Sequence, residues 1–74
     1  MPFTKICTIE FSIPSADGSV SLLARNEVTG MEEKKIYKTE AAARGAATRF
    51  ENRMMRVYGR TVPNWCMERL QVHG

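Results

Sequence analysis

Between positions 43 and 57, apolar residues recur at intervals of three and four, which is the spacing of one face of an α-helix. These residues are Ala43, Ala46, Ala47, Phe50, Met54 and Val57. Thr39 is a favourable N-cap, Glu40 suits the positive end of the helix dipole, and Gly59 is a natural stop. We therefore expect a helix over residues 40–58, whose one continuous apolar face must pack on the rest of the chain.

The segments on either side of this helix alternate between apolar and polar residues, which predicts β-strands. The expected strands are residues 3–13, 20–28, 33–38 and 65–74. The first strand departs from the alternation at Ile6. In the third strand we expect Ile36 to face inward and the lysines to face water.

Two turns separate the first three strands. Asp17-Gly18 and Gly30 supply residues that adopt positive φ at little cost, so two hairpins in succession are expected. The last strand alternates with Cys66, Leu70 and Val72 inward.

The order strand, strand, strand, helix, strand predicts an α+β fold, in which one alanine-rich helix packs on one face of an antiparallel sheet. A chain of 74 residues is short, so we expect a single domain, 1–74, with a small core. On the helix, Gly45 points away from the apolar face. The sheet is expected to contribute Phe3, Cys7, Ile9, Phe11, Val20, Leu22, Ile36 and Leu70 to the core.

The reactive side chains are few, and they predict a protein that is not an enzyme. His73 is the one histidine and lies next to the last residue, while the carboxylates are scattered without a pair placed to share a proton. Cys7 and Cys66 are too few for a zinc site or a disulfide framework. We expect no cofactor, no metal and no small-molecule substrate. Without a secretory leader or an apolar run of about 18 residues, a cytoplasmic protein that does not bind membranes is expected.

A row of arginines is the strongest candidate for a binding surface. Arg49, Arg53, Arg56 and Arg60 follow an i, i+4, i+7, i+11 spacing and so project from one side of the helix, beside its apolar face. Three interpretations fit this row. It can track the phosphates of a nucleic acid, clamp carboxylates of a protein partner, or remain a solvated flank.

Two aromatic residues near the end of the row extend the candidate surface. Tyr58 ends the expected helix, and Trp65 follows in a Pro-Asn-Trp loop. Trp, Tyr and Arg are the residue types most enriched at binding hot spots. The alternative is that Trp65 covers the end of a small core.

Part of the chain resembles a family of DNA-binding folds. The strand, capped helix and terminal Tyr-Gly are carried by "KIYKTEAAARGAATRFENRMMRVYG", residues 35–59. This arrangement resembles the plant ethylene-response-type DNA-binding domain and the arm-binding domains of phage integrases, which lay three strands in the major groove with one helix behind. Here the exposed sheet face offers Ser19, Ser21, Leu23, Arg25 and Glu27. The resemblance implies a nucleic-acid-binding domain in which Arg25 and the helix arginines contact the nucleic acid.

The chain as a whole also resembles another class in style. Short, cysteine-poor single domains without a catalytic set are similar to phage and prophage accessory proteins, including anti-restriction and anti-CRISPR inhibitors. This resemblance implies a non-enzymatic protein that docks Arg49, Arg53, Arg56, Arg60, Tyr58 and Trp65 on a host protein or nucleoprotein complex. The net charge of +3 is compatible with either type of partner.

Overall fold

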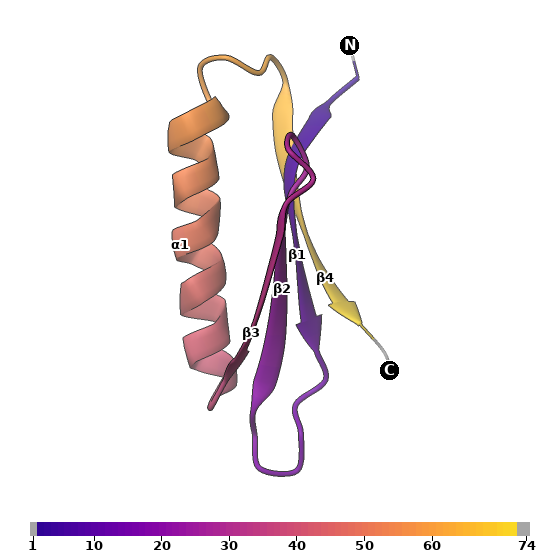
Figure 1. Cartoon of the computed structure of the whole chain (residues 1–74), viewed down its shortest axis with the longest axis vertical. Coiled ribbons are helices and arrows are strands. Elements are labelled where there is room, and N and C mark those ends of the chain that lie inside the picture. The colour runs from indigo at the N-terminus through magenta and orange to yellow at the C-terminus, as the bar shows by residue number, and fades with distance from the viewer. Residues whose placement is uncertain (1, 73–74) are drawn as a thin grey trace.

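Four strands and one helix make up the protein in a computed structural model that describes residues 2–72. The elements are β1 (Thr4–Ser12), β2 (Val20–Asn26), β3 (Glu32–Tyr37), α1 (Glu40–Tyr58) and β4 (Trp65–Val72). The strands form a single sheet in the order β3-β2-β1-β4, and α1 lies against one face of it (Figure 1). The predicted α+β class and the predicted order of elements are confirmed.

The prediction that the sheet is antiparallel throughout is wrong. β1 pairs antiparallel with β2, and β2 antiparallel with β3, but β4 pairs parallel with β1. The 19 residues of α1 span about 28 Å, close to the length of the nine-residue β1. The helix therefore returns the chain to the end of the sheet where β1 begins, and the next strand has to run in the direction of β1.

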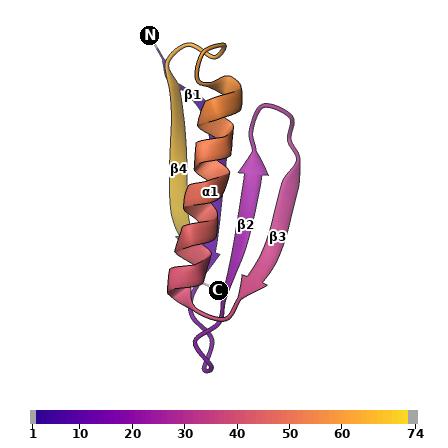
Figure 2. The same ribbon diagram turned by 90° about the vertical axis from the view of Figure 1, so that its left-hand side faces the viewer.

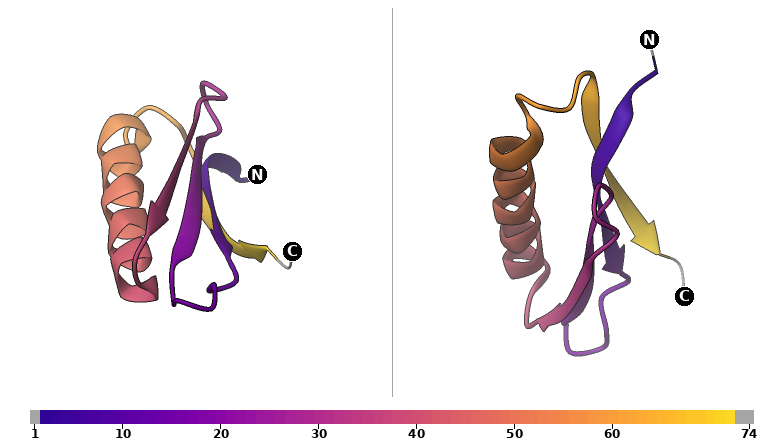
Figure 3. Two further views of the ribbon diagram at one scale, coloured as in Figure 1. Left: turned by 60° about the horizontal axis from the view of Figure 1, so that its bottom comes forward. Right: turned by 45° about the horizontal axis from the view of Figure 1, so that its top comes forward.

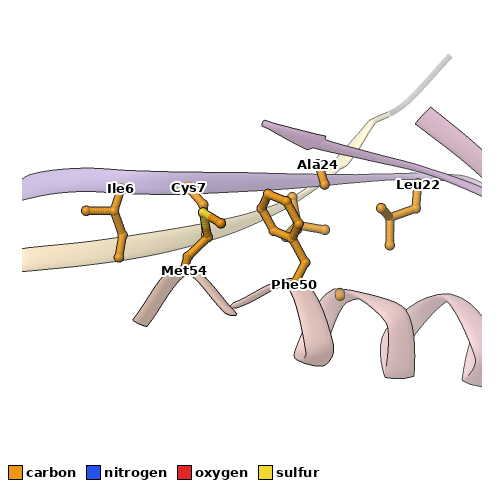
Figure 4. Close-up of a cluster of buried hydrophobic side chains, with 8 residues drawn as sticks. Ile6, Cys7, Leu22, Ala24, Phe50 and Met54 are labelled. Carbon is orange, nitrogen blue, oxygen red and sulfur yellow. The ribbon is translucent and has the colours of Figure 1, made fainter. Parts of the chain in front are cut away.

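A β-bulge in β1 explains why Ile6 departs from the alternation. The register with β4 passes from Lys5–Cys66 directly to Cys7–Met67, which leaves Ile6 as an extra residue. Ile6 and Cys7 consequently both point toward α1, and both are fully buried (Figure 4). The bulge also reverses the faces of the residues before it. Phe3, predicted to lie in the core, is 74% exposed.

β4 presents the opposite face from the one predicted. Trp65 and Met67 pack against the core cluster, and Arg69 reaches Glu51 on α1, so the odd-numbered residues face the helix. Cys66, Leu70 and Val72 therefore lie on the face without a helix, and Leu70 is not a core residue. In a strand, a shift of one residue exchanges the two faces. Because the alternation is weak around Glu68, the sequence does not determine which residues of this strand face the helix.

The helix begins and ends as predicted. The Thr39 hydroxyl accepts a hydrogen bond from the Ala42 backbone N–H at 3.1 Å, and Gly59 follows the last helical residue. The helix residues Ala43, Ala47, Phe50 and Met54 are buried, and Figure 4 shows Phe50 and Met54 directed at the sheet. Ala46 is half-buried, while Val57, predicted to lie in the core, is exposed. The apolar face is thus narrower than the sequence spacing indicated.

The third strand also faces the other way. Its residues Glu33, Lys35 and Tyr37 pair with Ala24, Leu22 and Val20, which are buried under the helix. Ile36 therefore lies on the opposite face and is 69% exposed. Both views of Figure 3 place α1 on one side of the sheet, and the described residues place no helix on the other. β3 lies at the edge of the sheet, where α1 covers it little. Neither of its faces is therefore required to carry apolar side chains, and the apolar Ile36 does not show which face is turned to the helix.

Candidate binding groove

A groove of about 580 Å³ lies between α1 and β3. The two elements meet near the start of the helix and diverge toward its end, so that β2 and β3 emerge on one side of α1 (Figure 2). The wall on the helix side includes Ala46, Arg49, Phe50, Asn52, Arg53 and Arg56, and the strand side consists of Leu22, Ala24, Glu33, Lys34, Lys35 and Tyr37. The helix thus leaves one lateral part of the sheet face open.

The groove is strongly basic. Its lining includes five cationic residues but only one carboxylate, that of Glu33. Lys35, Arg49, Arg53 and Arg56 have their side chains on this side of the sheet, whereas the register of β3 places the Lys34 side chain on the opposite face. Arg53 lies 3.4 Å from the Glu33 carboxylate, and both side chains are more than half exposed. The single Glu33 charge cancels one of the cationic charges, so the groove keeps a net positive charge. The groove is therefore suited to an anionic ligand.

Cationic side chains also cover the aromatic rings of the groove. The Arg53 guanidinium lies 5.2 Å from the centre of the Phe50 ring, and the Lys35 ammonium lies 5.5 Å from that of Tyr37. Both contacts are within the range of cation–π attraction. The rings hold the long side chains over the groove, which orders part of the positive charge before a ligand arrives.

Only part of the predicted arginine row reaches this groove. Arg49, Arg53 and Arg56 line it, whereas Arg60 lies beyond the end of the helix and does not. Tyr58 and Trp65 also lie outside the groove, where both pack against the core. The Tyr58 hydroxyl accepts a hydrogen bond from the Asn26 side-chain amide at 3.1 Å. The six predicted partner-binding residues are therefore divided: three line the groove, Tyr58 and Trp65 pack against the core, and Arg60 is exposed beyond the helix.

Arg25 lies on the other face of the sheet. It forms ion pairs with Glu32 at 2.6 Å and with Glu27 at 3.9 Å, and the Glu32 hydrogen bond raises the pKa of its guanidinium. The same face carries the carboxylates of Glu10 and Glu68. Four carboxylates surround Arg25 and Lys5 on this surface, which makes it a poor match for phosphates.

Sequence reasoning assigned none of the β3 residues of the groove to a binding site, among them Lys35 and Tyr37. Their positions follow from the pairing of Leu22 with Lys35 and of Val20 with Tyr37, because paired residues of neighbouring strands point to the same face. The pairing of β2 with β3 identifies these two residues. It can be used with the sequence alone only once it is known which residues of β2 face the helix.

The two cysteines lie on opposite faces of the sheet, and both are free thiols. Burial raises the pKa of the Cys7 thiol from its ordinary value of 9.0 to about 11, and the charges of Glu51 and Glu27 act in the same direction. We expect iodoacetamide at about pH 8 to alkylate Cys66 in the native protein and to spare Cys7, since the thiolate is the reactive form. Equal labelling of both thiols, measured by peptide mass analysis, would contradict the assignment of Cys7 to the core.

The raised pKa of Cys7 also determines how the stability of the protein changes with pH. An unfolded chain loses the Cys7 proton near pH 9.0, whereas the folded protein keeps it until about pH 11. The contribution of this thiol to stability is therefore complete below pH 9.0 and is lost as the pH rises through about 11. Urea unfolding of the wild type and of Cys7→Ala across this range isolates the effect, because only the wild type has the thiol.

Within residues 2–72, no three His, Cys, Asp or Glu side chains come together as a metal site, and no helix is both long and apolar enough to cross a membrane. His73 lies outside the described residues. No protein-family model, curated protein or solved structure matches this chain. What the groove binds is therefore inferred from its own residues.

Proposed function

We propose that this protein is a non-enzymatic binding protein whose α1–β3 groove takes an acidic segment of a partner protein. One observation carries the proposal: the groove has five cationic lining residues and the single carboxylate of Glu33. Arginine suits this role because its planar guanidinium binds a carboxylate with two parallel hydrogen bonds. In the proposed role the protein inhibits or modulates a host protein or nucleoprotein complex by occupying its acidic surface, as phage or prophage accessory proteins do.

Nucleic-acid binding is the second candidate, because Arg49, Arg53 and Arg56 also have the chemistry to contact phosphates. Its form is restricted by the opposite sheet face, where Arg25 forms ion pairs with Glu27 and Glu32 and where Glu10 and Glu68 also lie. A nucleic acid that lay on this face would meet repulsive carboxylates. Of the predicted nucleic-acid contacts, Arg49, Arg53 and Arg56 are the ones that the structure gathers in one groove.

Charge reversal at the groove tests the proposal. We expect Arg53→Glu/Arg56→Glu to lower the affinity for fluorescent poly-glutamate by at least about tenfold, since two cations that clamp carboxylates become anions. The matched control is Arg44→Glu/Arg60→Glu, which changes the net charge equally but alters residues outside the groove. Fluorescence anisotropy measures the affinity, and circular dichroism verifies that each variant is folded.

Equal losses in the two double variants would mean that net charge alone drives binding and would refute a groove site. A single-stranded oligonucleotide is titrated in parallel at two salt concentrations. If it binds more tightly than poly-glutamate, and only the groove variant weakens it, nucleic acid replaces protein as the ligand. The logarithm of the binding constant then falls with the logarithm of the salt concentration by about 0.7 per phosphate contact for single strands, so the slope gives the number of contacts.

A further inference from the structure

β3 is an edge strand, and its outer side is open. In the sheet order β3-β2-β1-β4, which covers residues 2–72, the strand has a neighbour on one side only. Figure 2 shows β3 as the outermost strand, clear of the helix, and the residues that line the groove include Glu33, Lys35 and Tyr37 of this strand. An edge strand presents backbone groups that can pair with another strand. The groove and the free edge therefore adjoin, and a single ligand can use both.

One hydrogen bond shows which residues of β3 direct their backbone N–H and C=O groups toward β2 and which direct them outward. The Asn26 N–H donates to the Met31 carbonyl oxygen at 2.8 Å, so these opposed residues form a hydrogen-bonded pair. Such pairs alternate along an antiparallel ladder. In the register Ala24–Glu33, the backbones of Glu33, Lys35 and Tyr37 thus point to β2. The N–H and C=O groups of Glu32, Lys34 and Ile36 point outward.

The burial of the groove floor decides what kind of protein segment fits. Leu22, Ala24 and Phe50 retain only 5%, 2% and 7% of their exposure. A docked amphipathic helix is anchored by an apolar groove, and here little apolar surface remains to be buried. A strand added at an edge instead gains its affinity from backbone hydrogen bonds and uses alternate side chains for specificity. The closed floor and open edge favour the strand.

We infer that the ligand segment is an extended strand that pairs with the outer edge of β3 and carries acidic residues at every second position. This inference rests on the proposed function and adds the form of the ligand. Alternate side chains of an added strand lie on the helix face, next to Lys35 and within the reach of Arg49 and Arg53. The other side chains lie on the opposite face beside Lys34 and Ile36, where no acidic residue is required.

The charged sequence of β3 is compatible with this ligand. Lysine and glutamate on an edge strand discourage pairing with apolar strands and with a second copy of the same chain. They do not oppose an acidic strand, because Lys35 and the arginines of α1 outnumber Glu33 on the face of its acidic side chains, and Glu32 is paired with Arg25 on the other face. The edge thus combines protection from aggregation with selectivity for an anionic partner.

The probe is a blocked eight-residue peptide in which glutamate alternates with threonine. We expect Ile36→Pro to weaken its binding at least about tenfold, because proline removes an outward N–H donor and places its ring on the pairing edge. Ile36→Thr is the matched control: it keeps the N–H and loses the same exposed side chain, so its affinity is expected to stay within about twofold of the wild type. Neither substitution changes the charge of the protein.

Amide hydrogen exchange reports the pairing residue by residue. On saturation with the peptide, exchange of the Glu32, Lys34 and Ile36 amides is expected to slow, whereas those of Glu33, Lys35 and Tyr37 already pair with β2 in the free protein. A second peptide has the same side chains but an N-methyl group on every backbone amide, so neither of its edges can donate the backbone bonds. It is expected to bind at least about tenfold more weakly.

The outcomes separate this inference from the function on which it rests. If Arg53→Glu/Arg56→Glu abolishes peptide binding but Ile36→Pro and N-methylation do not, an acidic ligand enters the groove without strand pairing, and the inference is overturned. If the arginine variant binds as the wild type does, the proposed function fails as well. The strand-pairing inference is supported if exchange of the Glu32, Lys34 and Ile36 amides slows and if both Ile36→Pro and N-methylation of the peptide weaken binding as predicted.

Discussion

Phe50→Ala is expected to lower the free energy of unfolding by about 3–5 kcal/mol, the largest effect of any substitution considered. Phe50 is 7% exposed and lies in the middle of the helix face that meets the sheet (Figure 4), against a cluster that includes Ile9, Leu22 and Met54. Truncation removes the ring and leaves a cavity that α1 can close only by moving. Urea denaturation followed by circular dichroism measures the loss. A domain of this size has only about 5–15 kcal/mol in total, so this loss is a large fraction of its stability.

Val57→Ala is the control for this prediction. Val57 belongs to the same run of apolar residues in the sequence, but it is 54% exposed. Its truncation is expected to change the free energy of unfolding by no more than about 0.5 kcal/mol, as is usual for exposed positions. A Val57 variant as unstable as the Phe50 variant would show that the helix is rotated, and the arginines would then point away from the groove.

Ala47→Leu is expected to destabilise the protein by about 1–3 kcal/mol. Ala47 is fully buried between α1 and the sheet, where its small side chain allows close approach of the helix. A leucine at this position has no free volume to occupy, so it must displace the helix or adopt a strained rotamer. The expected measurement is a lower midpoint of thermal unfolding in differential scanning calorimetry.

Ala46→Leu provides the contrast, because the preceding residue lines the groove. Its added carbons can extend along the open side of α1, over Leu22 and Ala24, without displacing the sheet. We expect its stability to lie within about 0.5 kcal/mol of that of the wild type. A larger loss for Ala46→Leu than for Ala47→Leu would mean that the groove is closed in solution.

The sequence allowed prediction of those elements whose signals are local. The period of α1, its Thr39 cap and its end at Gly59 all lie within one segment, and all were confirmed. The turns at Gly18 and Gly30 were also predicted, and both glycines have positive φ, 86° and 82°. β2 was assigned the correct inward face, since Val20, Leu22 and Ala24 are packed under the helix and show the alternation without interruption.

Prediction was less successful where a strand depends on its neighbour. Nothing local in β4 distinguishes the face of Met67 from that of Leu70, and its pairing with β1 selects the former. The arginine row shows the same limit. Periodicity placed Arg49, Arg53 and Arg56 on one side of the helix, but only the position of α1 on the sheet turns that side into the wall of a groove.

The sequence by itself determined that this protein is one helix and four strands in a fixed order, because capping, turn chemistry and hydrophobic period act over a few residues. The tertiary structure alone decided that β4 runs parallel to β1, that Ile6 forms a bulge, and that β3 remains uncovered beside the helix arginines. These features depend on the length of the helix relative to the sheet and on the registers of distant segments. They involve contacts between residues far apart in the chain, which local propensity cannot encode.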